Sequence, residues 1–103
     1  MIVVIVDHYV KPGLMEAAER RVNANGALAV DAPGFRFRYT LIARDNPLKL
    51  TAVTGWDSEA AYTAHVEARQ AHQQGPAFSG ERPYESVVNE VFQVKGAEVA
   101  AAR

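Results

Sequence analysis

The sequence has no cysteine among its 103 residues. Disulfide bonds, thiolate nucleophiles and thiolate metal ligands are therefore excluded. It also has no excess of charge, since 11 basic residues stand against 12 acidic ones. A duplex nucleic-acid binder usually carries a basic surplus, so we expect no nucleic-acid partner. The absence of cysteine fits a reducing compartment, and we expect a cytoplasmic protein.

Long apolar runs are absent as well. No stretch approaches the ~20 apolar residues that a membrane-spanning helix needs, so we expect no membrane partner. The first residues already follow a strand pattern, without the basic segment and cleavage site of a secretory signal. Histidine is scarce, with only three in the chain, and no two of them form a ligand cluster on one element. We therefore expect no metal site.

The residues that are present provide one core. Hydrophobic residues make up 49% of the chain, and its length predicts one domain. Alternating and β-branched residues predict strands over 1–10, 35–44, 48–56 and 84–94. Apolar periodicity and capping residues predict helices over 14–31 and from about 58 to 73. The order β-α-β-β-α-β predicts an α+β, ferredoxin-like fold with two helices on one face of a four-stranded antiparallel sheet. We assign this domain to residues 1–95 and a loosely ordered tail to 96–103.

The first and last predicted strands are apolar on both faces. Val3 and Ile5 occupy one face of the first strand, and Val87 and Val91 occupy one face of the last. Two helices cover only one face of such a sheet, and soluble monomers rarely expose a large apolar patch. We therefore expect a homodimer in which these two sets of residues meet the same sheet of a second copy across a two-fold axis. The alternative is that these β-branched residues only satisfy strand propensity.

Residues 56–65 read Trp-Asp-Ser-Glu-Ala-Ala-Tyr-Thr-Ala-His. A Trp that ends a strand, followed by an acidic residue, a Ser and a helix with His nine positions on, resembles the antibiotic biosynthesis monooxygenase (ABM) domain family. The Pro-Gly pairs at 12–13 and 33–34 add to the resemblance, which covers residues 1–95. It implies a ferredoxin-like monomer that pairs into a dimeric α/β barrel.

The resemblance implies a choice of activities. Some members of the family oxidise polycyclic quinols without a cofactor, and others degrade haem, act on small signalling molecules or have no assigned activity. The haem-degrading branch uses an Asn on the first strand, a second Trp on the second helix and an axial His late in that helix. The first two positions correspond here to Val6 or Asp7 and to Ala64, and His72 lies close to the third. Haem degradation is therefore not expected.

The lead hypothesis is a cofactor-independent monooxygenase, or a related small-molecule enzyme, that acts on an aromatic quinol-like compound with dioxygen. Such chemistry needs a general base, a hydrogen bond that holds the substrate anion, and a dry apolar cavity. A second hypothesis is a non-catalytic ligand-binding or stress-related module that uses the same pocket. A haem binder is the third.

His65 is the first candidate for the base, since imidazole titrates near neutral pH. It shares a helical face with Ala61, Ala64, Ala68 and His72. The alternative is that His65 only packs and hydrogen-bonds. His8, in register with the apolar residues of the first strand, is the second catalytic candidate.

The predicted substrate contacts complete this pocket. Aromatic side chains of the second strand should stand opposite the His65 face and roof a cavity, whereas Arg36 and Arg38 alternate onto a solvated or interface face. Trp56 is better explained as an architectural anchor than as a ligand contact. For His72 the alternative is a structural role in which its charge favours the helix dipole. Tyr62 and Phe78 would gate the pocket, and the loop over 75–83 would be its lid. The predicted substrate-binding residues are Asn25, Phe37, Tyr39, Trp56, Tyr62, His72 and Phe78.

Overall fold

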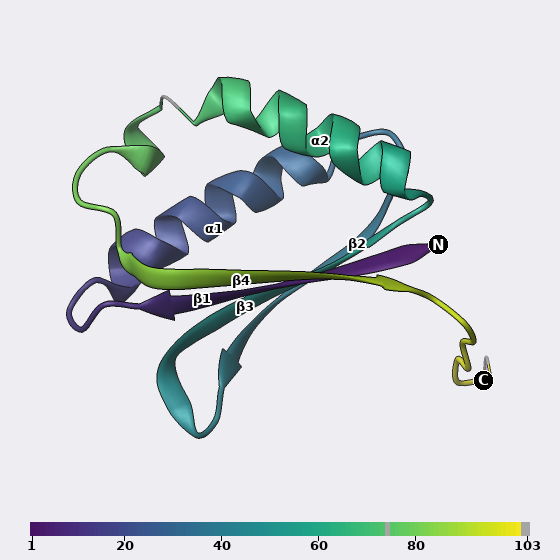
Figure 1. The fold of residues 1–103 in the computed structure, drawn as a ribbon, viewed down its shortest axis with the longest axis horizontal. Coiled ribbons are helices and arrows are strands. Elements are labelled where there is room, and N and C mark those ends of the chain that lie inside the picture. The colour runs from purple at the N-terminus through teal and green to yellow at the C-terminus, as the bar shows by residue number, and fades with distance from the viewer. Residues whose placement is uncertain (74, 102–103) are drawn as a thin grey trace.

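The structure is a computed structural model that describes residues 1–73 and 75–101 (Figure 1). The strands are β1 (Ile2–Val10), β2 (Phe35–Ala43), β3 (Asn46–Trp56) and β4 (Tyr84–Gln93). The helices are α1 (Met15–Ala29), α2 (Glu59–His72) and a short 3-10 helix, η1 (Pro76–Phe78). The predicted order β-α-β-β-α-β is confirmed, and η1 is an addition within the predicted loop. Residues 94–101 contain no helix or strand, and 102–103 of the expected tail lie outside the described residues.

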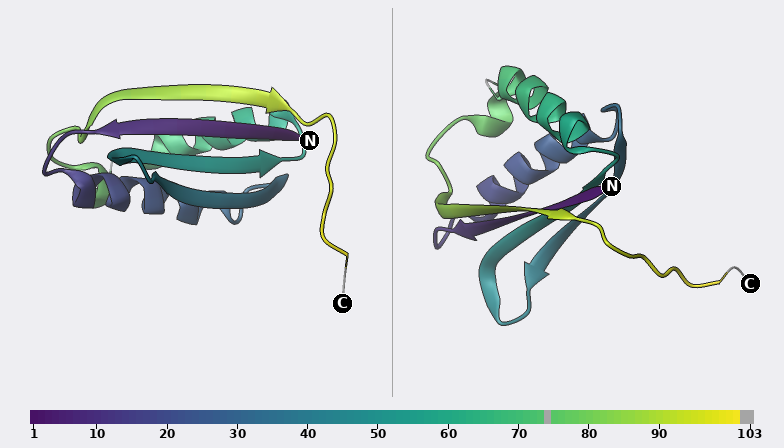
Figure 2. Two further views of the ribbon diagram at one scale, coloured as in Figure 1. Left: turned by 90° about the horizontal axis from the view of Figure 1, so that it is seen from below. Right: turned by 45° about the vertical axis from the view of Figure 1, so that its right-hand side comes forward.

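The four strands form one antiparallel sheet in the order β2-β3-β1-β4. Both helices lie on the same side of this sheet, and the opposite face carries no helix (Figures 1 and 2). This arrangement confirms the predicted ferredoxin-like α+β fold. Within the described residues, no helix has the length and apolar content needed to cross a membrane.

The core lies between the helices and the sheet, in two clusters. One gathers around Trp56, which is only 1% exposed. Its indole Nε1 donates a hydrogen bond of 2.9 Å to Thr54 Oγ1. The second cluster joins the first half of α1 to the sheet. The buried members of the two clusters are, respectively, Ile2, Val4, Ala29 and Trp56, and Val10, Ala18, Val22 and Leu50.

The start of α2 is fixed by a cap and by a close contact. Ser58 Oγ accepts a hydrogen bond of 3.1 Å from the backbone N–H of Ala61, and Glu59 follows in the first turn. Such a cap satisfies one of the free N–H groups at a helix start. Gly34, in the connection from α1 to β2, has φ +82° and would place a Cβ 2.6 Å from Ala61 Cβ. Only glycine allows this connection to lie against α2.

The face assignment predicted for β2 is wrong beyond its first residue. Phe35 pairs with Trp56, but a β-bulge follows, and Phe37 pairs with Gly55 while Arg38 pairs with Thr54. A bulge inserts one extra residue, so the alternation after it is inverted. Phe37 and Tyr39 consequently lie on the helix-free face. Arg38, expected on a solvated or interface face, lies beneath the helices.

The register of β4 also corrects the predicted apolar face. Val3 of β1 pairs with Phe92, whereas Val4 pairs with Val91. Paired residues share a face, so Phe92 lies on the helix-free face and Val91 lies on the helix side. The apolar set on the helix-free face therefore differs from the predicted one, since Val88 and Phe92 replace Val87 and Val91.

We expect Trp56→Phe to lower the free energy of unfolding by about 1–2 kcal/mol, because it leaves a small cavity and an unpaired Thr54 hydroxyl. Urea denaturation at fixed protein concentration measures this. Thr54→Val removes the same hydrogen bond from the other side. The double variant should cost less than the sum of the two single variants, because both partners are then gone. Additive losses would contradict the role given to this hydrogen bond.

Candidate functional site

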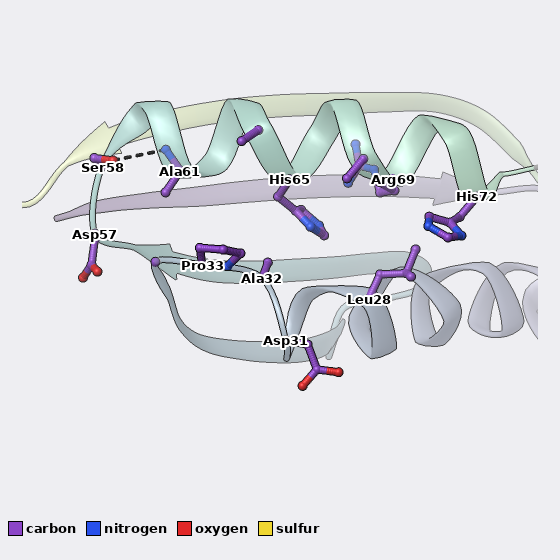
Figure 3. A pocket seen from close by; sticks show the side chains of 13 residues that line it. Leu28, Asp31, Ala32, Pro33, Asp57, Ser58, Ala61, His65, Arg69 and His72 are labelled. Atoms are coloured by element: carbon purple, nitrogen blue, oxygen red, sulfur yellow. Dashed lines mark hydrogen bonds between the residues drawn. The ribbon is translucent and has the colours of Figure 1, made fainter.

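A groove of about 470 Å³ runs between α2 and the end of α1, and we call it the outer cavity (Figure 3). One wall is the small-residue face of α2 that the sequence predicted to border a pocket. The other wall is Leu28 and the connection from α1 to β2, not the expected aromatic side chains of β2. The α2 residues that line it are Ala61, Ala64, His65, Ala68, Arg69 and His72, and the connection contributes Asp31, Ala32, Pro33 and Gly34.

A second space of about 30 Å³, the inner pocket, adjoins the outer cavity between the helices and the sheet. His65 and Arg69 line both spaces, so their side chains stand at the boundary. The inner pocket collects polar residues from α1, α2 and three strands. Its other lining residues are Val6, His8, Val22, Asn25, Arg38, Ala52, Thr54, Trp56 and Tyr62.

His65 is buried, with 6% of its surface exposed. Its ring stacks on Trp56 with a centroid distance of 4.8 Å and an interplanar angle of 29°. Burial lowers the pKa of His65 below its usual 6.5, and the positive charges of Arg69 and Arg38 lower that pKa further. The imidazole is therefore neutral at neutral pH and has a free acceptor nitrogen.

His8 lies on β1 and lines the inner pocket. Its Nδ1 donates a hydrogen bond of 3.0 Å to the carbonyl oxygen of Leu50. This bond requires a proton on Nδ1 and leaves Nε2 as the acceptor of the neutral ring. Burial lowers the pKa of His8, although the Leu50 hydrogen bond and the nearby charge of Asp7 act in the opposite direction.

Sequence reasoning missed two arginines in the inner pocket. Arg38 reaches it because the bulge in β2 turns its side chain inward, where Nη2 donates a hydrogen bond of 2.9 Å to the carbonyl oxygen of Val22. Burial lowers the pKa of Arg38, and the charge of Arg69 adds to that effect. Arg69 follows His65 by four positions, so helical spacing would have placed it on the same face. No comparable signal exists for Arg38.

Three of the predicted substrate contacts line the inner pocket: Asn25, Trp56 and Tyr62. Asn25 Oδ1 is buried and has no hydrogen-bond partner within the described part of the chain. The hydroxyl of Tyr62 accepts a hydrogen bond of 3.2 Å from Asn89 Nδ2. His72 lines the outer cavity and is exposed at its mouth.

The other three contacts do not lie where they were predicted. Phe37 and Tyr39 lie on the helix-free face because of the bulge, so they cannot roof the cavity. Phe78 lies in η1, and its carbonyl oxygen accepts a hydrogen bond of 3.2 Å from Arg21 Nη2. Of the described residues, none between 75 and 83 lines either space. Phe78 and the expected lid therefore do not line this site, whereas Tyr62, the other residue of the expected gate, does.

The described residues contain no group of three or more His, Asp or Glu side chains arranged to hold a metal ion. The polar side chains that line the inner pocket carry imidazole, guanidinium, amide, indole and hydroxyl groups, and the carboxylates of Asp31 and Asp57 line the outer cavity. The groups of the inner pocket can accept a proton and hold an anion.

Fold and site together define a ferredoxin-like domain with a polar pocket between its helices and its sheet. The sequence model of the family described as antibiotic biosynthesis monooxygenase matches residues 1–79, and the chain belongs to this family. No curated protein matches the sequence significantly.

Solved structures share the fold over almost the whole chain. The haem degrader MhuD from Mycobacterium tuberculosis, with two haems bound, is 21% identical with a TM-score of 0.78, over 97% of this chain and 100% of that one. SnoaB, a cofactor-independent oxygenase from Streptomyces nogalater, is 17% identical with a TM-score of 0.75, over 93% and 94%. A conserved protein from Methanosarcina mazei is 18% identical with a TM-score of 0.77, over 91% and 92%.

We expect the NMR titration midpoints of His8 and His65 to lie below 6.5, the usual value, because burial disfavours the charged rings. The two histidines bind protons more readily in the unfolded chain than in the folded one. The free energy of unfolding should therefore fall as the pH drops below 6.5, and these two histidines should not change it at higher pH. Arg69→Gln should raise the His65 midpoint, whereas Arg20→Gln, at an exposed ion pair with Glu16, should not. A His65 midpoint above 6.5 would contradict this.

Proposed function

We propose that the protein is a cofactor-independent monooxygenase that acts on an aromatic quinol-like compound, with His65 as the general base. The observation that carries this proposal is the buried, neutral imidazole of His65 at the boundary of the two spaces. Membership of the antibiotic biosynthesis monooxygenase family supports it. So does the shared fold with SnoaB, itself a cofactor-independent oxygenase.

The chemistry requires a substrate that supplies its own electrons. His65 accepts a proton from the bound quinol-like compound, and the resulting anion transfers an electron to dioxygen. Recombination joins one oxygen atom to carbon, and loss of water leaves a ketone. The substrate supplies all four electrons that dioxygen accepts, so the reaction balances without a redox cofactor.

Each pocket residue has a task in this reaction. The Asn25 Oδ1 acceptor, which lacks a partner, binds a substrate hydroxyl, and Tyr62 and Trp56 shape the wall beside it. His8 offers Nε2 as a second proton acceptor. His72 contacts the substrate at the mouth of the outer cavity. Displacement of water from the inner pocket by the substrate would strengthen each of these interactions.

Haem fits these residues poorly. At the first-strand position where a haem degrader would place an Asn, Val6 has no polar group. Asp7 lies on the helix-free face, where it accepts a hydrogen bond of 2.7 Å from Thr51 Oγ1. The resemblance puts the position of the second Trp near Ala64, which has no aromatic ring. These two positions therefore do not carry the side chains that the haem-degrading branch uses there, and only His72 lies close to one of its positions.

We expect His65→Ala to reduce oxygen consumption with an anthrone or naphthohydroquinone substrate by about a hundredfold or more, since it removes the base. In the parent enzyme, kcat/KM should fall as pH drops through the lowered pKa of His65, below 6.5. An oxygen electrode measures both.

Thr63→Ala, at an exposed position on the same helix, is the matched control and should keep full activity. Full activity of His65→Ala would contradict the proposed base. A bound quinol that stabilises the protein thermally but never consumes oxygen would instead support the non-catalytic ligand-binding module.

We also propose that the protein is a homodimer joined through the helix-free faces of two sheets. Exposed apolar side chains of β2 and β4 lie on this face, among them Tyr39, Val88 and Phe92 at 61%, 51% and 40% exposure. A patch of this kind is rarely left open in a soluble monomer. The bulge in β2 enlarges it, since Phe37 and Tyr39 join it.

Phe92→Asp should convert the dimer to a monomer, because a carboxylate would be buried without a partner. Val91→Asp changes the neighbouring residue, which is similarly exposed on the helix side, and should leave the dimer intact. Size-exclusion chromatography with light scattering at micromolar concentration measures the mass. A monomeric parent protein would refute the dimer.

A further inference from the structure

Arg38 and Arg69 are two positive charges that the described chain does not neutralise. Its ion pairs join Lys11 to Glu81, Arg20 to Glu16, Arg36 to Asp57 and Lys49 to Asp7. None of them includes Arg38 or Arg69. The two guanidinium groups are close enough for the charge of Arg69 to lower the pKa of Arg38.

The groups around the two arginines supply no negative charge. The neighbouring polar groups in the inner pocket are His8 of β1, His65 of α2 and the amide of Asn25 of α1. Asp7 is close enough to raise the pKa of His8, but its carboxylate is bonded to Thr51 on the other face of the sheet. At the far end of the outer cavity, Asp57 is paired with Arg36 and Asp31 is exposed.

Two half-buried like charges without a counter-ion cost free energy, and a bound anion would recover part of it. Arg69 Nε is buried and has no hydrogen-bond partner within residues 1–73 and 75–101. Arg38 uses one of its nitrogens on Val22 and keeps other donors free. A guanidinium binds a carboxylate through two parallel hydrogen bonds, which a neutral amide cannot match.

The two spaces differ in size, so each suits a different part of a ligand. The inner pocket, at about 30 Å³, has room for one or two waters or a group of that size, as a carboxylate is. The outer cavity, at about 470 Å³, falls in the range of small-ligand sites, and its Ala, Leu and Pro walls suit an aromatic ring. His65 and Arg69 stand between the two spaces.

We infer that the site binds an aromatic carboxylate, whose carboxylate enters the inner pocket between Arg38 and Arg69 while its ring lies in the outer cavity. This inference rests on the proposed function and deepens it, since it gives the substrate class. A hydroxyl beside that carboxylate on the ring then lies near His65, at the boundary of the two spaces.

The test compares two probes with the same ring and hydroxyl, 1-hydroxy-2-naphthoate and 1-hydroxy-2-naphthamide. The amide is neutral and has an NH2 donor in place of one carboxylate oxygen. Titration calorimetry on the unchanged protein should show at least tenfold tighter binding of the carboxylate, about 1.4 kcal/mol. Arg69→Gln and Arg38→Gln should each remove most of this preference. Arg20→Gln makes the same change in net charge at an exposed site and should keep it.

Equal affinity for the two probes, or no binding of the carboxylate at millimolar concentration, would overturn the inference. The comparison on the unchanged protein needs no variant, so it stands even if Arg38→Gln misfolds. Binding is measured without turnover and is therefore separate from oxygen consumption. If the protein oxidises a neutral quinol but binds the two probes equally, only the anion site is refuted. If it binds the carboxylate selectively but oxidises no quinol, only the proposed oxygenase activity is refuted.

Discussion

The contact between Trp56 and His65 is the interaction on which the site depends. Trp56 ends β3, is fully buried and donates its indole N–H to Thr54, so its ring has one orientation. Phe35 packs edge-on against it, with ring centroids 5.4 Å apart. His65 stacks on the same indole, which fixes both the height of α2 above the sheet and the direction of the imidazole. The residue that anchors the fold is thus also a wall of the inner pocket.

Local patterns predicted the elements and the α2 face, because periodicity and caps act over a few residues. The small-residue face of α2 does border a cavity. The opposite wall could not be predicted, since it depends on a bulge between Phe35 and Phe37 that no turn residue marks. Because of this one inserted residue, Arg38 lies under the helices, and Phe37 and Tyr39 lie on the helix-free face. The face of Val91 likewise depends on its pairing with Val4, a contact distant in sequence.

Gly26 connects the stability of α1 to the site. Glycine inside a helix costs about 1 kcal/mol relative to alanine, and from sequence alone Gly26 weakens the predicted helix. In the structure α1 runs through it without a break, and a Cβ there would lie 2.9 Å from Arg38 Nε. This glycine, which has a low helix propensity, lies where the Arg38 side chain passes beneath α1 to reach the carbonyl oxygen of Val22. Glycine at position 26 thus leaves room for the half-buried Arg38 side chain in its observed position.

The charges of Arg69 and Arg38 also affect the proposed base, His65. Burial is the main cause of the lowered pKa of His65, and the two arginines add to it, so in the empty pocket the imidazole is a weak base. A carboxylate between Arg38 and Arg69 would offset their part of the effect, because opposite charges nearby favour the protonated ring. The pKa of His65 would then move back toward its usual range as the substrate enters. Since a base works best with a pKa near the working pH, binding of the anion and proton transfer from its neighbouring hydroxyl would support each other.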